Sequence, residues 1–190
     1  MDLAKEKQAL RKETVEKRES ISKEEFESKS SAIKKRIFTL PEWKQASIIY
    51  TYASMRNEPD TIEVIEKALQ EGKKVCVPKI FGKEMRFIPI DSTDRLKKGT
   101  WGIPEPDDTG VYEDRPGLMI VPGILFGRDF NRIGYGAGYY DRYFDGRRED
   151  DGWFLVAVAY DFQIRPEIPR EEFDIYMDAL ITNKETLRRK

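Results

Sequence analysis

The chain has 190 residues, no histidine and one cysteine, and its 34 basic residues nearly balance 35 acidic ones, for a net charge of −1. The lack of histidine excludes a Ser-His-Asp triad, a Cys-His pair and any His-ligated zinc site, and a single cysteine excludes disulfides within the chain. The near-neutral charge argues against a general nucleic-acid binder. There is no signal-peptide core and no apolar run of roughly 18 residues, so we expect a cytoplasmic protein with no membrane or nucleic-acid partner.

The first half of the chain predicts two helices followed by a strand, a helix and a strand. Residues 3–20 contain few helix breakers, and Ser22 with Glu25 is a capping-box signal for a second helix. Residues 48–53 then form an apolar run typical of a buried strand. A helix from Asp60 to Gly72 and a strand over residues 74–78 complete a βαβ unit, which favours a parallel sheet. The second helix carries an apolar stripe of Phe26, Ile33, Ile37 and Leu40.

The second half alternates in the same way, and no linker divides the chain. Residues 98–108 are rich in Gly and Pro and predict an ordered loop, as do residues 123–133. We therefore expect one domain over residues 1–190, of the α/β class, with three α/β/α layers and a mostly parallel central sheet. Strands are expected over residues 85–90, 118–122, 154–160 and 179–182, a helix from 139–144, and a closing helical turn or helix over 183–189.

The densest chemical signal runs from Arg132 to Arg142, RIGYGAGYYDR. Three glycines at alternate positions let the backbone approach a ligand closely and direct several N–H groups toward it. The flanking arginines could neutralise phosphate, and Asp141 could hold a magnesium ion through oxygen. The stretch is neither a Walker A loop nor a Rossmann fingerprint, because the residues after the glycines differ. The alternative is a tight turn whose tyrosines pack on the sheet.

The first helix places three cations close together around its axis. Arg11 lies about 40° and Arg18 about 20° from Lys7, at about 100° per residue. They border the face that carries Leu3, Leu10 and Thr14. They could reach a phosphate site at its rim, but a row of cations on a surface helix is the simpler interpretation, and the pattern alone favours it.

Two loops carry weaker signals. In residues 54–61, Glu58 and Asp60 could bind the polar edge of a ligand, or Asp60 could only cap the following helix. In residues 101–106, Trp101 could cover a flat ring, although a surface loop pinned by a buried Trp is slightly favoured.

These segments, in this order, resemble the 5-formyltetrahydrofolate cyclo-ligase family. The resemblance spans nearly the whole chain, and its most specific part is the GYGAGYYDR stretch. The matching pieces are residues 7–11, 58–61, 102–106, 121–126 and 132–142, then Asp174 and residues 181–182.

The resemblance implies a compact three-layer α/β fold and a cyclisation that consumes ATP. In this family the formyl oxygen of 5-formyltetrahydrofolate attacks the γ-phosphate to give an imino-phosphate. The nitrogen at position 10 then attacks the activated carbon, which gives 5,10-methenyltetrahydrofolate, ADP and phosphate. The protein has to align two small molecules and neutralise phosphate charge, which requires no histidine.

The resemblance also implies roles for individual residues. Arg132, Tyr140 and Asp141 are the implied catalytic residues, and Asp141 and Asp174 the implied Mg²⁺ ligands. The implied ATP contacts are Lys7, Gln8, Ala9, Leu10, Arg11, Arg132, Ile133, Gly134, Tyr135, Gly136, Ala137, Gly138, Tyr139 and Tyr140. The implied folate contacts are Met55, Glu58, Asp60, Tyr135, Gly136, Ala137, Gly138 and Tyr139, to which we add Trp101 as a wall for the folate ring.

Two positions depart from the family pattern F-D-x-x-G-x-R. Gly127 and Phe130 replace its Asp and its Gly, so the loop before Arg132 is expected to follow another path. The departures leave room for a paralogue with the same ATP chemistry on another folate or amide. A non-catalytic module that binds folate or nucleotide is a further alternative. In each case we expect small-molecule ligands and a monomer.

Overall fold

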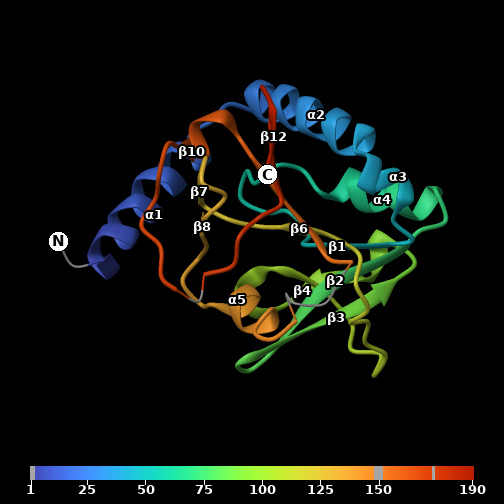
Figure 1. Cartoon of the computed structure of the whole chain (residues 1–190). Helices are drawn as coiled ribbons and strands as arrows, with labels where there is room; N and C mark the ends of the chain where they lie inside the picture. The colour runs from blue at the N-terminus through green and yellow to red at the C-terminus, as the bar shows by residue number, and fades with distance from the viewer. Residues whose placement is uncertain (1–2, 148–151, 173) are drawn as a thin grey trace.

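The computed structural model describes residues 3–147, 152–172 and 174–190 (Figure 1). The helices are α1 (Leu3–Glu19), α2 (Lys23–Thr39), α3 (Pro41–Gln45), α4 (Ile62–Gln70) and α5 (Tyr139–Tyr143), with short 3-10 turns η1 (Thr93–Arg95), η2 (Thr100–Gly102) and η3 (Asp161–Gln163). The strands are β1 (Ile48–Thr51), β2 (Lys74–Phe81), β3 (Glu84–Ile90), β4 (Leu96–Lys98), β5 (Pro104–Pro106), β6 (Leu118–Val121), β7 (Leu125–Gly127), β8 (Arg132–Ile133), β9 (Phe154–Ala159), β10 (Ile164–Arg165), β11 (Ala179–Thr182) and β12 (Thr186–Arg188).

A seven-stranded sheet in the order β12-β11-β9-β6-β1-β2-β3 forms the centre of the molecule. The inner strands are parallel, and the edge strands β12 and β3 are antiparallel to their neighbours. Ile49 of β1 lies opposite both Val75 of β2 and Leu118 of β6, which confirms the predicted parallel βαβ unit.

The helix or helical turn predicted over residues 183–189 is wrong. Residues 186–188 form strand β12, which pairs with β11. The Thr182 hydroxyl accepts hydrogen bonds from the N–H groups of Lys184 and Glu185, at 3.0 Å each, and so reverses the chain into a hairpin. The sheet edge offers this segment backbone partners that its local pattern does not reveal.

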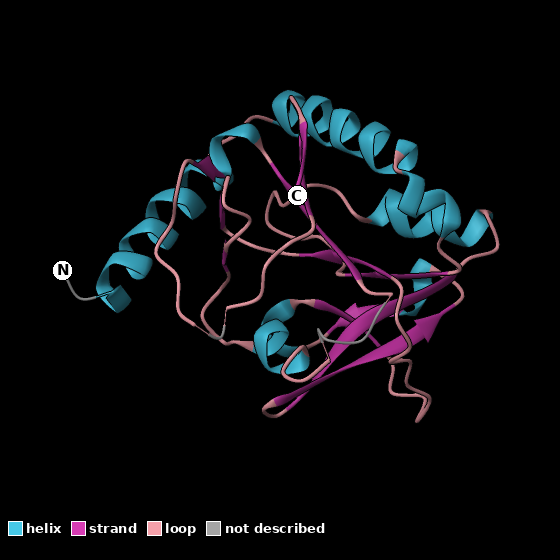
Figure 2. Cartoon of the chain, viewed as in Figure 1, coloured by secondary structure: helices cyan, strands magenta, loops and turns pink. Residues whose placement is uncertain are grey.

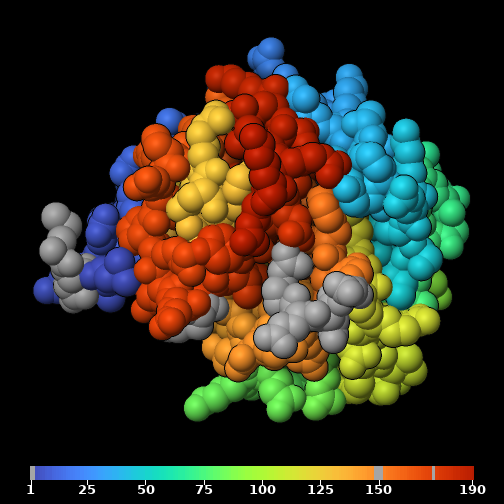
Figure 3. All heavy atoms as spheres, in the orientation of Figure 1, coloured from blue at the N-terminus to red at the C-terminus, as the bar shows by residue number. Residues whose placement is uncertain are grey.

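Helices cover both faces of the sheet, which confirms the predicted three layers (Figure 2). On one face, α2, α3 and α4 bury Ile37, Trp43 and Ile65 against the apolar side chains of β1, β6 and β9. The other face packs against α5 and an aromatic cluster that includes Tyr143 and Trp153. Figure 3 shows the red and orange C-terminal segments filling the space between blue α1 and the cyan helices.

Two segments predicted as loops contain short strands. Within residues 98–108, β5 pairs with β4, and within residues 123–133, β7 and β8 form an antiparallel pair that β10 extends. Phe130, in the turn between β7 and β8, has φ 67°, a left-handed conformation typical of Gly. Phe130, which replaces the Gly of the family pattern, thus keeps a Gly-like backbone conformation. The strand after this turn begins with Arg132, one of the predicted site residues.

Helix α1 packs beside this small sheet, at the left in Figure 1. Leu10 packs against Leu125, Ile133 and Ile168. The contact turns the buried side of α1 toward the carboxyl ends of the parallel strands, which is where sheets of this kind form ligand sites.

Candidate active site

A cavity of about 320 Å³ opens where β1, β2 and β6 end. It is lined by segments far apart in the sequence, from α1 to the residues before β11. Among the predicted site residues, those that line it are Lys7, Arg11, Met55, Glu58, Trp101, Arg132, Ile133, Gly134, Tyr135, Gly136, Ala137, Gly138, Tyr139, Tyr140, Asp141 and Asp174.

Four predicted residues lie outside the lining of this cavity. Gln8 and Ala9 are exposed on α1, and Leu10 belongs to the small apolar cluster described above. Asp60 accepts a hydrogen bond from the Ile62 N–H at 2.9 Å and pairs with Lys34 at 3.0 Å. Asp60 therefore caps the start of α4, which is the structural alternative that the sequence left open.

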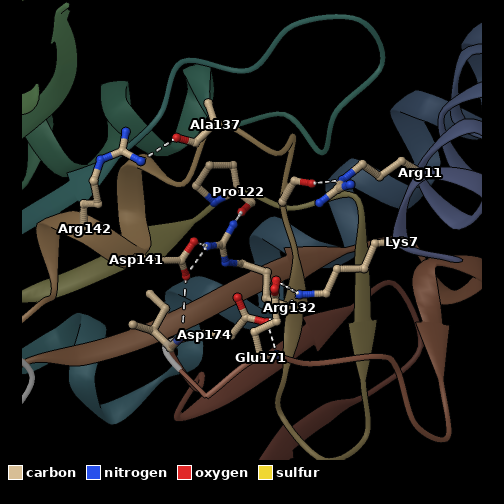
Figure 4. Close-up of polar contacts among 11 residues, drawn as sticks. Lys7, Arg11, Pro122, Arg132, Ala137, Asp141, Arg142, Glu171 and Asp174 are labelled. Atoms are coloured by element: carbon tan, nitrogen blue, oxygen red, sulfur yellow. Dashed lines mark hydrogen bonds and ion pairs between the residues drawn. The ribbon is translucent and has the colours of Figure 1, made fainter. Parts of the chain in front are cut away.

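Cations and carboxylates alternate at one end of the cavity (Figure 4). The ammonium group of Lys7 lies 2.8 Å from carboxylate oxygens of both Glu171 and Asp174. The guanidinium of Arg132 donates to both carboxylate oxygens of Asp141, at 2.9 and 3.0 Å. These pairs bring together residues from the first helix, the Gly-rich stretch and the chain before β11.

Lys7 and Arg18 are buried, with 5% and 2% of their surfaces exposed. The simpler interpretation, a row of cations on a surface helix, is therefore wrong for these two residues. Burial lowers the pKa of Lys7, but its hydrogen bonds to Asp174 and Glu171 outweigh this effect and raise it overall. The ammonium group thus stays charged inside the cavity.

The Gly-rich stretch forms a tight turn at the floor of the cavity. Gly136 and Gly138 have φ values of 98° and 66°, which favour glycine. A Cβ at Gly134 would lie 2.3 Å from Nη1 of Arg132, so any other residue here would make the Arg132 side chain shift from its present position. Arg11 donates to the Gly134 carbonyl at 2.8 Å and so ties the turn to α1.

The other end of the cavity combines a buried carboxylate with apolar and aromatic walls. Glu58 is 6% exposed and accepts hydrogen bonds from the Tyr135 hydroxyl and, at 3.0 Å, from the Met55 N–H. Burial raises the pKa of Glu58 above its usual range. Further lining side chains at the cavity are Ile80, Met85 and Ile103.

Trp101 is 64% exposed at the rim of the cavity, so the interpretation of a loop pinned by a buried Trp is wrong. Its backbone has φ 54°, and its ring centroid lies 6.1 Å from that of Tyr139. Two aromatic rings beside an open cavity can stack against a planar ligand.

Several lining residues were not predicted from the sequence, among them the acid Glu171, and the cation Arg18 was left out of the predicted site. Glu171 lines the cavity and holds Lys7, and its only sequence signal is its place three residues before Asp174. The helix repeat placed Arg18 on the same face as Lys7. Its contact partner, Tyr135, lies 117 positions further along the chain. No local pattern predicts that contact.

Within residues 3–147, 152–172 and 174–190, no three Asp, Glu or Cys side chains gather closely enough to hold a metal ion by themselves. None of the helices in the described part of the chain is both long enough and apolar enough to span a membrane.

The sequence comparisons decide the family. The model of the 5-formyltetrahydrofolate cyclo-ligase family matches residues 3–183. The chain belongs to this family. It is accordingly an enzyme of the ligase class, and the cavity is its candidate active site.

Relatives agree over almost the whole chain. The probable 5-formyltetrahydrofolate cyclo-ligase of Schizosaccharomyces pombe is 32% identical, over 86% of this chain and 88% of its own. The mouse 5-formyltetrahydrofolate cyclo-ligase is 27% identical, over 92% of each chain. The structure of the Aquifex aeolicus 5,10-methenyltetrahydrofolate synthetase superimposes with a TM-score of 0.82 at 32% identity and covers 96% of this chain and 92% of its own.

Proposed function

We propose that this member of the family closes 5-formyltetrahydrofolate to 5,10-methenyltetrahydrofolate, converting ATP to ADP and phosphate. The observation that carries the proposal is one cavity with two chemically different ends. Cations, two of them paired with acids, line one end, and a buried carboxylate with aromatic and apolar walls lines the other. A polyphosphate and a flat heterocycle with N–H donors need these two environments side by side.

ATP binds at the cationic end in this proposal. Lys7, Arg11 and Arg132 supply positive charge, and the Gly-rich turn lets the backbone lie close to the phosphates. Because Lys7 and Arg132 are now paired with acids, we expect the phosphates to compete with Asp174 and Asp141 for them.

Mg²⁺ fits the same end. Asp141 and Asp174 offer hard oxygen ligands, and this ion is commonly held by one or two carboxylates together with substrate phosphates. The lack of a three-acid cluster among the described residues is therefore compatible with Mg²⁺ bound jointly with ATP. Such an ion would neutralise phosphate charge.

The folate ring occupies the other end in this proposal. The Glu58 carboxylate accepts hydrogen bonds from the N–H groups of the heterocycle, and Trp101 and Tyr139 flank the ring. In this proposal the formyl group lies between Glu58 and the phosphate-binding residues.

The chemistry then needs alignment and charge neutralisation above all. The formyl oxygen attacks the γ-phosphorus, the bond to ADP breaks, and an imino-phosphate forms. Nitrogen 10 attacks the activated carbon, loses its proton, and phosphate leaves. Arg132 stabilises the charge on the transferred group, and Tyr140 packs against Arg132, whose guanidinium lies 5.8 Å from the tyrosine ring centroid.

A spectrophotometric assay tests the proposal. Purified protein is mixed with 5-formyltetrahydrofolate, ATP and magnesium, and the near-ultraviolet band of the methenyl product is followed. The band should rise only when all components are present, and Asp141→Ala should abolish the rise. No rise, with calorimetry still showing ATP binding, would favour a paralogue that acts on another folate or amide. Binding of both ligands without turnover in any such panel would favour a non-catalytic module.

The expected monomer and the cytoplasmic location stay predictions. Analytical ultracentrifugation tests the first, and fractionation of the source cells tests the second.

A further inference from the structure

A buried cation lies behind the carboxylate end of the cavity. Arg18, in the last turn of α1, is 2% exposed and does not belong to the cavity lining. Its Nη1 donates to the Tyr135 hydroxyl at 2.8 Å and lies 3.8 Å from Oε1 of Glu58. The Tyr135 hydroxyl donates in turn to the same carboxylate oxygen.

The direction of these hydrogen bonds is set by chemistry. A guanidinium can only donate, so the Tyr135 hydroxyl must accept from Arg18 and is left with its own hydrogen for Glu58. Charge-assisted bonds of this kind hold their partners more firmly than neutral ones. The carboxylate is therefore fixed on one side by Tyr135 and on the other by the Met55 N–H.

Burial of Arg18 does little for the fold by itself. Removing a guanidinium from water is costly unless its donors are satisfied. Within the described ranges, Nε of Arg18 has no hydrogen-bond acceptor. An apolar side chain would fill this position at a smaller free-energy cost. The geometry therefore favours a role for Arg18 at the candidate active site.

Helix α1 forms hydrogen bonds with two consecutive residues of the Gly-rich turn. Arg11 donates to the carbonyl of Gly134, and Arg18 donates to the hydroxyl of Tyr135. Helix α1 thus carries cations that line the cationic end of the cavity and one cation that lies behind the carboxylate end.

We infer that Arg18 is a positioning residue: acting with Tyr135, it keeps Glu58 oriented and ionised, so that the carboxylate accepts N–H donors of the bound heterocycle. The identity of that heterocycle as a folate rests on the proposed function. The effect of Arg18 on Glu58 does not, and it can be measured without substrate.

The surroundings of Glu58 support this role. Burial raises the pKa of Glu58, and the Arg18 charge is the largest influence that lowers it. Arg56, on the same loop, also lowers it, but this cation is exposed to solvent, which screens its charge. Other titratable groups whose electrostatics involve the carboxylate are the hydroxyls of Tyr52, Tyr135, Tyr140 and Tyr160. Loss of Arg18 should thus move the Glu58 pKa further up.

The first experiment compares Arg18→Met with Lys12→Met, which removes an exposed cation from the same helix. Calorimetry measures binding of 5-formyltetrahydrofolate and, separately, of ATP. We expect Arg18→Met to weaken folate binding roughly tenfold, the effect of losing a hydrogen bond to a charged group, and to leave ATP binding within about twofold. Folate binding should also fail at a higher pH than in the wild type as the solution is acidified. Lys12→Met should change neither.

Two further variants keep the test valid if Arg18→Met folds poorly. Arg18→Lys keeps the charge without the planar fork, so it should recover part of the pH shift. Tyr135→Phe removes only the hydroxyl, and its effect on folate binding should not add to that of Arg18→Met, because both break one chain of hydrogen bonds.

A second experiment needs no ligand. NMR of the ¹³C-labelled carboxyl groups, with Glu58 assigned through Glu58→Gln, follows its titration in both proteins. An upward shift of the Glu58 titration in Arg18→Met supports the inference even if the protein proves not to bind folate. An unchanged titration, or equal losses of folate and ATP affinity in Arg18→Met and Arg18→Lys, would overturn it.

Discussion

Single cations at the charged end of the cavity differ in how their charge is balanced. Lys7 is held by Glu171 and Asp174, and Arg132 by Asp141. Arg11 instead donates to a neutral backbone carbonyl, and among the described residues no acid forms an ion pair with it. Arg11 therefore has charge available for an incoming phosphate without first losing an acidic partner.

Replacing Arg11 with Ala should raise the KM for ATP about tenfold, because one charge-assisted contact to phosphate is lost. The KM for the folate should change little. Initial rates at varied ATP measure the effect, and Lys12→Ala, an exposed change on the same helix, is the control. An unchanged KM for ATP would remove Arg11 from the phosphate site.

At the scale of elements, α2 shows how a local signal becomes a layer of the fold. Ser22 accepts a hydrogen bond from the Glu25 N–H at 3.1 Å, and the Glu25 side chain accepts one from the Ser22 N–H at 3.3 Å. The predicted capping box is confirmed, and so is the predicted stripe, since Ile33, Ile37 and Leu40 are buried in the core. The cap sets where the helix begins, and the stripe sets which side faces the sheet.

Ser22→Ala should lower the free energy of unfolding by about 1 kcal/mol, because it removes the side-chain acceptor at the start of α2. Urea unfolding followed by circular dichroism measures this value. Ser28→Ala, an exposed change inside the same helix, is the matched control and should be neutral or slightly stabilising. Equal effects of the two changes would contradict a special role for the cap.

At the scale of the whole molecule, ion pairs join segments that are distant in sequence. The Asp161 carboxylate lies 2.8 Å from the ammonium group of Lys29 in α2 and 2.6 Å from that of Lys184 near the C-terminus. Burial is the largest single influence on the pKa of Asp161 and raises it, but the hydrogen bonds to Lys184, Lys29 and Asn183 and the charge of Lys29 together lower it well below its usual range. These two ion pairs connect α2 and the last hairpin to the segment that follows β9.

Asp161→Asn should cost about 1 to 2 kcal/mol of stability at pH 7. Because the pKa of Asp161 is lower in the folded than in the unfolded protein, its contribution is present above about pH 4 and is lost as the pH falls through the folded-state value. The difference from wild type should therefore shrink toward acid pH. Urea unfolding across this range measures it, with exposed Asp91→Asn as control. A difference that does not vary with pH would contradict the assignment.

The sequence by itself determined the elements whose signals are local. The capping box, the apolar stripe of α2 and the βαβ unit depend on residues close in the chain, so periodicity and caps were enough to predict them. The Gly-rich turn is equally local, since the positive φ angles at Gly136 and Gly138 favour glycine at those positions. The family pattern extended the prediction to the residues that line the cavity.

Only the tertiary structure decided which of these side chains meet. A helix repeat places Lys7 and Arg18 on one face, but the small sheet beneath α1 determines that this face is buried. The exposure of Trp101, the capping role of Asp60 and the pairing of β12 likewise depend on partners elsewhere in the chain. Burial and hydrogen bonding between distant segments are properties of the folded chain, and neither is encoded in any short stretch of it.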